Sequence, residues 1–425
     1  MKTTFLTVQV FLLAALAHGQ VFSHGLTPAQ QQIAWAESAI QADPEKTQPY
    51  NDLAVACVHR ARETGDSSYL DQADIALQAS TKRAPDNIES QKAHAMILLG
   101  RGRFKEALEF ARKLNAKTPD DIFTYGFIAD AAIGLGDYAE AERATQWMLD
   151  LREGNVPALL RAARLRSIYG DTDGALDFYS QAYQQIPPTQ TEEQAWALTK
   201  IAEIQFSTGH LDEAENLLHS ALQKFPGYYL VLELSARVAT ARHQFQEALV
   251  LVRQRNNNFP SLSSRYALAK ALERAGQTTE ATAAYTEFET KALSAANAES
   301  NANRDLVFYY LGRGNNRVEA LRIAEHEAGV RHDVSTLDAY AWALCGNGRY
   351  DQAERQITAA LAVGIRDAEM LYHAGVIAEK RQDHISAIRY LRGSLELNPS
   401  SEVSSEAHDA LAKSMGVSVL ASNAR

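Results

Sequence analysis

Small apolar residues recur at a nearly constant spacing along most of this chain. The clearest series consists of ten alanines with gaps of 34, 34, 34, 39, 34, 33, 39, 33 and 34 residues: Ala73, Ala107, Ala141, Ala175, Ala214, Ala248, Ala281, Ala320, Ala353 and Ala387. A second series stands twelve residues before nine of them: Ala95, Ala129, Ala163, Ala202, Ala236, Ala269, Phe308, Ala341 and Gly375. Helices approach closely where side chains are this small, so each period predicts one antiparallel helical hairpin.

Turn and stop signals separate the two series. A glycine followed by a large residue recurs inside the period, as in Gly136-Asp137-Tyr138 and Gly348-Arg349-Tyr350, and glycine readily adopts the positive φ that ends a helix. Proline closes many periods, at Pro85, Pro119, Pro187, Pro226, Pro260 and Pro399. Proline lacks the N–H that would continue the second helix. The pattern predicts an all-α solenoid in which each hairpin packs on its neighbours.

This combination of period, turn and closing proline resembles the tetratricopeptide repeat family. The segments GRFKEALEFARKLNAKTPD, ending at Asp120, GHLDEAENLLHSALQKFPG, ending at Gly227, and RQDHISAIRYLRGSLELNPS, ending at Ser400, are similar to second halves of that repeat. The resemblance covers roughly residues 47–400, about ten repeats. It implies a right-handed superhelical solenoid of antiparallel helical hairpins.

The pattern also divides the chain into segments. They are a signal peptide at 1–19, a capping helix or half repeat at 27–44, about seven repeats at 47–290, a linker or helix extension at 291–300, three repeats at 301–400, a capping helix at 401–416 and a tail at 417–425. Thr27 and Gln30 have the spacing of a capping box. Ala54 and Ala73 stand nineteen residues apart, seven more than usual, so the first turn is expected to open into a loop.

Two longer gaps interrupt the alanine series. Residues 187–194 insert five residues before the fourth regular repeat, and the second insertion follows Tyr285. The repeat after that insertion has Phe308 where its siblings have a small residue. Because phenylalanine is too large for a close helix crossing, either this hairpin is expected to be splayed or its neighbour to be shifted, with a kink or hinge in the superhelix.

The N-terminus has the pattern of a secretory signal peptide. Met1-Lys2 is followed by an apolar run from Phe5 to Ala17, and cleavage is expected after Ala17 or Gly19. An uncleaved anchor is the alternative, although the run is shorter than a membrane span. No other segment is apolar enough to cross a bilayer, so the mature chain is expected to be secreted or periplasmic without an integral span.

The net charge bears on the kind of partner that is expected, and the cysteines bear on whether a disulfide is expected. The chain has 42 Lys and Arg against 52 Asp and Glu, a net charge of −10, so no nucleic-acid partner is expected. The two cysteines, Cys57 and Cys345, lie in distant repeats. Since distant repeats of a solenoid are not expected to meet, both thiols are predicted to be free.

Motifs for catalysis or metal binding are missing from the sequence. It has no P-loop, no CxxC and no GxSxG elbow, and His326-Glu327-Ala328-Gly329-Val330 has valine where a zinc-protease helix needs its second histidine. We therefore expect no enzyme activity, no cofactor, no metal site and no small-molecule substrate.

The family resemblance implies that the first helix of each repeat lines a concave groove. The residue after each small first-helix position, and residues about one or two turns earlier, are expected to face it. The candidate peptide-binding residues are Arg164, Arg237, Lys270, Trp196, Tyr266, Tyr309 and Trp342. Aromatic rings with Arg and Lys suit a protein or peptide segment. The alternative is a solvated ion-pair ladder in which Arg164 and Arg237 flank Glu203.

The sequence thus favours a non-catalytic scaffold or adaptor of the periplasm or cell envelope that binds a peptide or protein segment in its groove. One alternative is a structural subunit of an envelope export or polysaccharide assembly machine. Another is a regulatory subunit of an enzyme complex. The sequence leaves homo-oligomerisation and the identity of the partner open.

Overall fold

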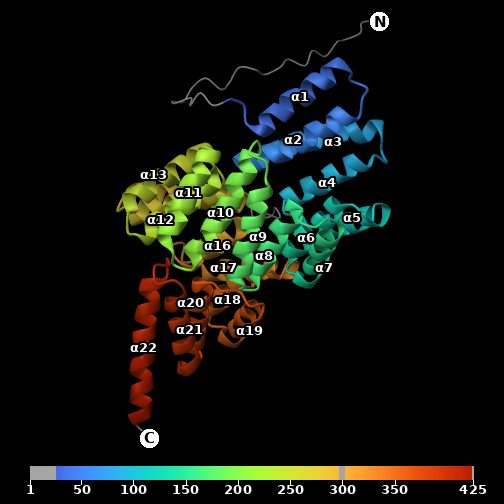
Figure 1. Cartoon of the computed structure of the whole chain (residues 1–425). Helices are drawn as coiled ribbons and strands as arrows, with labels where there is room; N and C mark the ends of the chain where they lie inside the picture. The colour runs from blue at the N-terminus through green and yellow to red at the C-terminus, as the bar shows by residue number, and fades with distance from the viewer. Residues whose placement is uncertain (1–24, 296–301, 424–425) are drawn as a thin grey trace.

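The structure, a computed structural model, describes residues 25–295 and 302–423. The signal peptide expected at 1–19, residues 296–300 of the expected linker and the last two residues of the tail lie outside these ranges. The described residues form 22 helices and no strand. They follow one another as antiparallel hairpins, with the N-terminal helix at the top of Figure 1 and the C-terminal helix at the bottom.

Ten hairpins make up the body of the solenoid in the described ranges. Their first helices are α2 (Gln48–Thr64), α4 (Ile88–Gly100), α6 (Ile122–Leu135), α8 (Val156–Ile168), α10 (Thr191–Ser207), α12 (Tyr229–Ala241), α14 (Leu262–Arg274), α16 (Ala302–Leu311), α18 (Val334–Gly346) and α20 (Ala368–Lys380). Their second helices are α3 (Ser68–Arg83), α5 (Phe104–Lys117), α7 (Tyr138–Leu151), α9 (Thr172–Gln185), α11 (Leu211–Lys224), α13 (Phe245–Asn258), α15 (Thr278–Ala295), α17 (Arg317–Val330), α19 (Tyr350–Ala362) and α21 (His384–Leu397). Helices α1 (Pro28–Ala42) and α22 (Ser404–Asn423) flank them.

The alanine series forms the core of every hairpin. None of its ten members is more than 1% exposed, and their first-helix partners Ala95, Ala129, Ala163, Ala202, Ala269 and Ala341 are fully buried. The turns between the helices have positive φ, for example 84° at Gly136 and 75° at Gly348. The predicted hairpin register is therefore confirmed for these repeats. At α1, Thr27 and Gln30 form the capping box that their spacing predicts.

The first hairpin differs from the expected one. Helix α2 continues to Thr64, and only Gly65, Asp66 and Ser67 separate it from α3. The prediction of a loop is therefore wrong, because most of the seven additional residues between Ala54 and Ala73 lengthen helix α2. An extra turn of helix keeps its backbone hydrogen-bonded, whereas an open loop would leave those groups to solvent.

The α16–α17 hairpin has one additional residue in its turn. In the α6–α7 hairpin the N–H of Asp137 donates to the carbonyl of Ala132, whereas here the N–H of Asn316 reaches back to Tyr310. Counting from Ala320, this shift places Val307 at the close helix crossing, where it is buried, and leaves Phe308 half-buried. The expected hinge rested on Phe308 at the crossing, and that placement is wrong by one residue.

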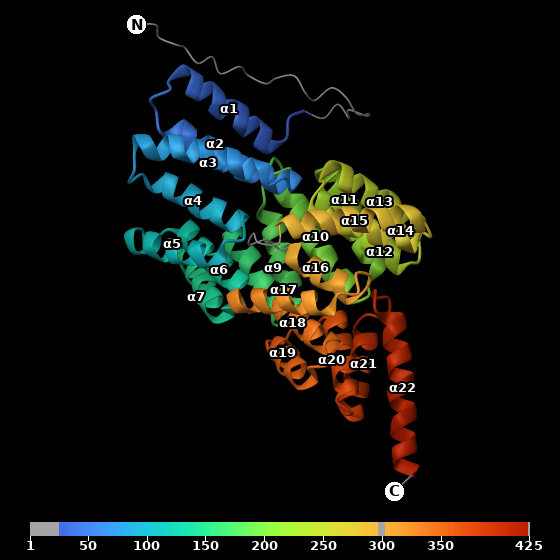
Figure 2. The ribbon, with the colours of Figure 1, turned by 180° about the vertical axis from the view of Figure 1, so that it is seen from behind.

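The solenoid winds tightly enough for repeats far apart in sequence to touch. The N–H of His332, after α17, donates to the carbonyl of Leu135 at the end of α6, over 2.9 Å. The Asn398 amide, after α21, donates to the carbonyl of Phe206 in α10, also over 2.9 Å. Figure 2 shows α17 beside α6 and α7. The expectation that distant repeats do not meet is therefore wrong, although Cys57 and Cys345 are both buried and free.

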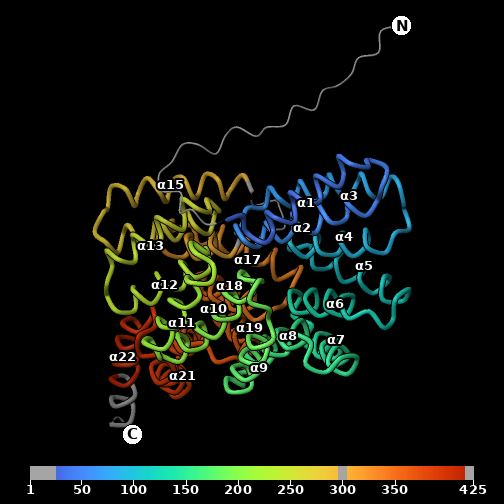
Figure 3. The backbone as a smooth tube through the Cα atoms, turned by 45° about the horizontal axis from the view of Figure 1, so that its top comes forward, coloured from blue at the N-terminus to red at the C-terminus, as the bar shows by residue number. Residues whose placement is uncertain are grey.

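Backbone packing at these contacts requires glycine at several positions, and the closest approach is at Gly170. A side chain added at Gly170, between α8 and α9, would place its Cβ 2.2 Å from the carbonyl oxygen of Gly364, between α19 and α20. The tight turn within a hairpin therefore lies against a loop that joins two hairpins in the next winding of the superhelix. The winding is seen in the tube of Figure 3, where α22 lies near α12 and α21.

Helix α22 covers the last hairpin and continues beyond its expected end. Ala407 is fully buried, and the Ser414 hydroxyl donates to the Glu379 carboxylate of α20 over 2.8 Å. The helix does not stop at Gly416 but reaches Asn423, so most of the predicted tail is helical. A single glycine inside a helix costs only about 1 kcal/mol, and no proline follows it. The loop between α21 and α22 is thereby fixed on the inner side of the superhelix.

Candidate binding groove

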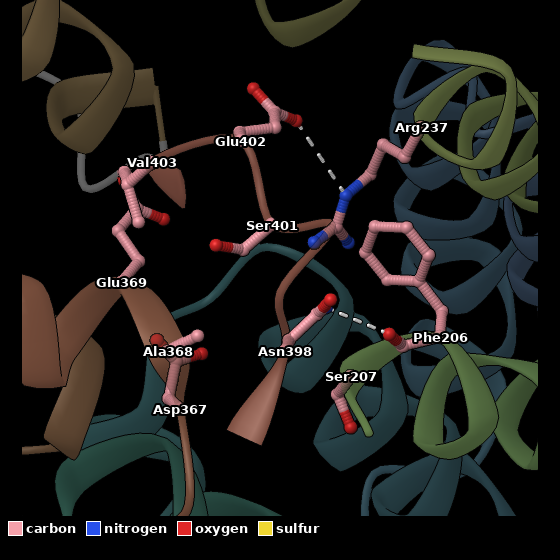
Figure 4. Close-up of a pocket in the computed structure, with 10 residues that line it drawn as sticks. All are labelled: Phe206, Ser207, Arg237, Asp367, Ala368, Glu369, Asn398, Ser401, Glu402 and Val403. Carbon is pink, nitrogen blue, oxygen red and sulfur yellow. Dashed lines mark hydrogen bonds and ion pairs between the residues drawn. The ribbon is translucent and has the colours of Figure 1, made fainter. Parts of the chain in front are cut away.

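Three cations on the first helices converge on one carboxylate. Arg274 lies one helical turn after Lys270 on α14, so both project from the same face, and Arg237 projects from α12. The Glu402 carboxylate, in the loop between α21 and α22, lies 2.8 Å from Arg274, 3.4 Å from Lys270 and 4.0 Å from Arg237. Figure 4 shows Arg237 directed at Glu402. We call Arg237, Lys270 and Arg274 the cation cluster.

The cation cluster controls the charge of Glu402. Burial alone would raise the pKa of this carboxyl, but the charges of Lys270, Arg274 and Arg237 outweigh it and hold the pKa of Glu402 well below its usual value. Glu402 is therefore a carboxylate throughout the physiological pH range. This side chain retains 27% exposure, so the cluster lies within reach of solvent.

A cavity of about 70 Å³ lies beside this contact, between the end of α10, the start of α20 and the α21–α22 loop. The guanidinium of Arg237 lies over the ring of Phe206, 4.7 Å from its centroid, and forms one wall. Glu369 forms another wall, and burial raises its pKa. The Ser401 hydroxyl is buried and lacks a hydrogen-bond partner among the described residues. The C-terminal loop therefore borders this cavity without satisfying all of its own polar groups.

An aromatic group occupies the C-terminal part of the same surface. The His373 ring shares a hydrogen bond of 2.8 Å with Asp338 and stacks on Trp342 with centroids 4.2 Å apart. The Phe308 ring also stacks on His373, with centroids 6.0 Å apart. Burial alone would lower the pKa of His373, but Asp338 and the charge of Glu369 raise it above its usual value. Trp342 is half-buried, and the buried His373–Asp338 pair supports one face of its ring.

The other predicted groove residues divide into accessible and buried groups. Arg164 is exposed and makes no ion pair with a described residue. Trp196 is half-buried, edge-on to Tyr179 and near the ammonium of Lys200. Tyr266 is half-buried below Lys270, whose ammonium lies 5.5 Å from its ring centroid.

Tyr309 does not face the groove. Its ring is buried against Tyr285, and its hydroxyl donates to Glu289 over 3.0 Å. The one-residue shift of α16 explains this, because it gives the groove position after the helix crossing to Phe308 instead. Tyr309 therefore supports the hairpin and is inaccessible to a partner.

Sequence reasoning missed Arg274, Glu402 and the Asp338–His373 pair. The spacing of Lys270 and Arg274 could have identified Arg274, because residues four apart share a helix face. Glu402 gave no such signal, since its position depends on how tightly the superhelix winds. The buried pair likewise depends on two hairpins meeting.

The described residues contain no group of three or more His, Cys, Asp or Glu side chains that could hold a metal ion. Burial raises the pKa of both Cys57 and Cys345 to about 11, so these thiols are poor nucleophiles. None of the described helices combines the length and apolarity that a bilayer crossing requires.

Comparisons with known proteins give one family match and several structural likenesses. Residues 340–402 match the tetratricopeptide repeat family. No curated protein sequence matches the chain. Similar solved structures include the APC/C hetero-tetramer Cut9–Hcn1 (15% identity, TM-score 0.45, 90% of this chain and 58% of that chain) and the human IFIT1 dimer with PPP-AAAA (14%, 0.48, 86% and 87%). Another is a thermophilic tetratricopeptide repeat protein of Thermus thermophilus (22%, 0.39, 46% and 98%).

This chain therefore spans little more than half the length of the Cut9–Hcn1 chain that it matches. The family match covers residues 340–402, and a similar helical hairpin recurs through the described residues. Repeats of this family are typically non-catalytic and support protein–protein interaction. The described residues form an all-α solenoid of about ten helical hairpins, and residues 340–402 of this solenoid match the tetratricopeptide repeat family.

Proposed function

We propose that this protein is a non-catalytic scaffold that binds an acidic, extended segment of a protein partner at the cation cluster. The observation that carries the proposal is Glu402, a carboxylate on a loop, which Arg237, Lys270 and Arg274 already hold. A partner segment with Asp or Glu would make the same contacts. Charge-assisted hydrogen bonds from guanidinium to carboxylate are among the strongest polar contacts in proteins.

Neighbouring side chains extend the surface in both directions along the groove. Arg164 offers an exposed guanidinium toward the N-terminal repeats, and the half-buried rings of Trp196 and Trp342 add aromatic area. Aromatic side chains bury much surface at low entropic cost, and arginine pairs with carboxylates in a fixed geometry. This combination favours a segment that alternates acidic and apolar residues.

The proposed place of action is the periplasm or the cell exterior. Support comes from the short apolar run between Phe5 and Ala17 behind a single lysine. N-terminal sequencing of the exported protein tests this part. A mature chain that begins at His18 or Gln20 supports it, and retention of Met1 in the cytoplasmic fraction overturns it.

Fluorescence anisotropy with two labelled ten-residue peptides tests the binding function. One peptide is glutamate-rich, and the other has lysine at the same positions. We expect the protein to prefer the glutamate peptide, and Arg237→Ala to weaken that binding about tenfold, because one charged hydrogen bond contributes about 1.5–3 kcal/mol.

The matched control is Arg322→Ala, because Arg322 pairs only with Glu319 of its own helix α17 among the described residues. It should bind the glutamate peptide like the unchanged protein. Equal affinity for both peptides, or unchanged affinity in Arg237→Ala, would contradict the proposed function.

A further inference from the structure

The loop that enters the groove is anchored on both sides of Glu402. Upstream, the buried Asn398 side chain donates to the carbonyl of Phe206, and Pro399 lies near Gly209 of the α10–α11 turn. Downstream, Ser404 begins α22, which packs on α20 and α21. Residues 398–402, which we call the C-terminal latch, are thus held against α10, α12 and α14.

The latch uses the contacts that an acidic partner needs. Glu402 pairs with all three residues of the cation cluster, most closely with Arg274, so an external carboxylate must compete with it for these contacts. A tethered group competes at an effective concentration in the millimolar range, above that of most free partners. The apparent affinity of a partner is reduced in proportion to the fraction of molecules with an open cluster.

The latch is also imperfectly paired. The Ser401 hydroxyl is buried beside Glu402 without a hydrogen-bond partner among the described residues. A buried, unpaired hydroxyl opposes the closed state, and it regains a hydrogen bond to water when the loop leaves. The cavity beside it means that the loop does not fill the groove tightly. Both features favour exchange with a longer acidic segment.

We propose that Glu402 is an internal competitor, and that an acidic partner segment binds by displacing the C-terminal latch from the cation cluster. This inference rests on the proposed function and adds its regulation. The groove is closed in the absence of a partner, and it opens only for a segment that outcompetes residues 398–402. A change that removes the charge of Glu402 keeps the groove open.

The test compares Glu402→Gln with Glu406→Gln in the full chain. Glutamine has nearly the shape of glutamate, and Glu406 is an exposed residue of α22 with no ion pair to a described residue, so both variants lose one charge near the same place. The probe is the labelled glutamate-rich ten-residue peptide. A second probe is a labelled peptide with the sequence of residues 397–405. Circular dichroism confirms that both variants are folded.

We expect Glu402→Gln to bind both probes at least about tenfold more tightly than the unchanged protein, which corresponds to an open fraction of about one tenth or less in the unchanged protein. Glu406→Gln should bind like the unchanged protein. If the unchanged protein, Glu402→Gln and Glu406→Gln bind the probes equally, while Arg237→Ala binds them more weakly, the latch is overturned. The proposed function would then remain intact. No binding of either probe by Glu402→Gln would overturn both.

Discussion

The backbone N–H of Val334 donates to the phenol oxygen of Tyr138 over 3.0 Å, although 196 residues separate the two. Tyr138 begins α7 and Val334 begins α18, so this bond joins two successive turns of the superhelix. Both residues are buried. Contacts of this kind bring the C-terminal loop, and with it Glu402, to the cation cluster.

Replacement of Tyr138 by phenylalanine removes the acceptor of this bond. The buried N–H of Val334 is then unpaired, so we expect Tyr138→Phe to lower the free energy of unfolding by about 1–3 kcal/mol. Urea denaturation measures the change. Tyr125→Phe is the control, because the Tyr125 ring stacks on Trp147 and its hydroxyl makes no hydrogen bond with a described residue. A loss no larger than that of the control would mean that the two turns are not joined here.

A pair of glycine substitutions separates backbone strain from contact between turns. Gly170 and Gly276 have nearly equal φ, 74° and 76°, but a Cβ at Gly276 has open space around it, whereas one at Gly170 meets the carbonyl of Gly364. Both alanine variants should lose about 1–2 kcal/mol from the left-handed conformation. Gly170→Ala should lose about 1–3 kcal/mol more from overpacking. Equal losses in urea denaturation would argue against the wound superhelix.

Two tryptophan substitutions test the register of α16. Val307 is buried at the close helix crossing and Phe308 is half-buried on the inner face. Val307→Trp should therefore lower the free energy of unfolding by about 1–3 kcal/mol, since overpacked cores are strained. Phe308→Trp should have the smaller effect. Thermal denaturation of both variants shows which one loses more stability. A larger loss in Phe308→Trp would mean that Phe308, and not Val307, lies at the helix crossing.

The pH dependence of stability should report His373. Its pKa is raised above 6.5 in the folded chain, so its stabilising contribution is complete below the unfolded value and is lost as the pH rises through the folded value. Denaturation midpoints should therefore fall as the pH rises above 6.5, and His373→Gln should flatten this fall.

His59 is the control on the acid side of the same pH profile, because its pKa is shifted in the opposite direction. Burial and the charge of Arg62 lower its pKa to about 4, so its contribution is present above 6.5 and is lost as the pH falls toward 4. His59→Gln should change only the acid side of the profile. A basic-side slope that persists in His373→Gln would assign it to another group.

Sequence alone predicts the hairpins of this fold well, because a local packing rule repeats at every period. Two small residues twelve apart, such as Ala95 and Ala107, pack together in each regular hairpin. The glycine in the turn of a hairpin, such as Gly136 between α6 and α7, sets the register of its two helices. The rule fails where the spacing changes for reasons that side chains do not reveal. A helix extension absorbs most of the excess after Ala54, and one added turn residue moves Phe308 out of the core.

The cation cluster and its contact with Glu402 could be predicted only in part. Arg237 and Lys270 follow from the position after the small first-helix residue, and Arg274 follows from the helical period. Glu402 does not, because its place depends on the superhelical pitch, which is the sum of small rotations at every hairpin interface. Residues that meet through this winding leave no periodic signal in the sequence.

The central claim is that the C-terminal loop places Glu402 in the cation cluster of the inner face. A double-mutant cycle between Arg274 and Glu402, which are 128 residues apart, tests it most directly. We expect Arg274→Ala and Glu402→Ala to show a favourable coupling of about 0.5–3 kcal/mol in urea denaturation, as contacting residues do. Arg274→Ala and Glu406→Ala should be additive. A coupling of zero between Arg274 and Glu402 would contradict the account.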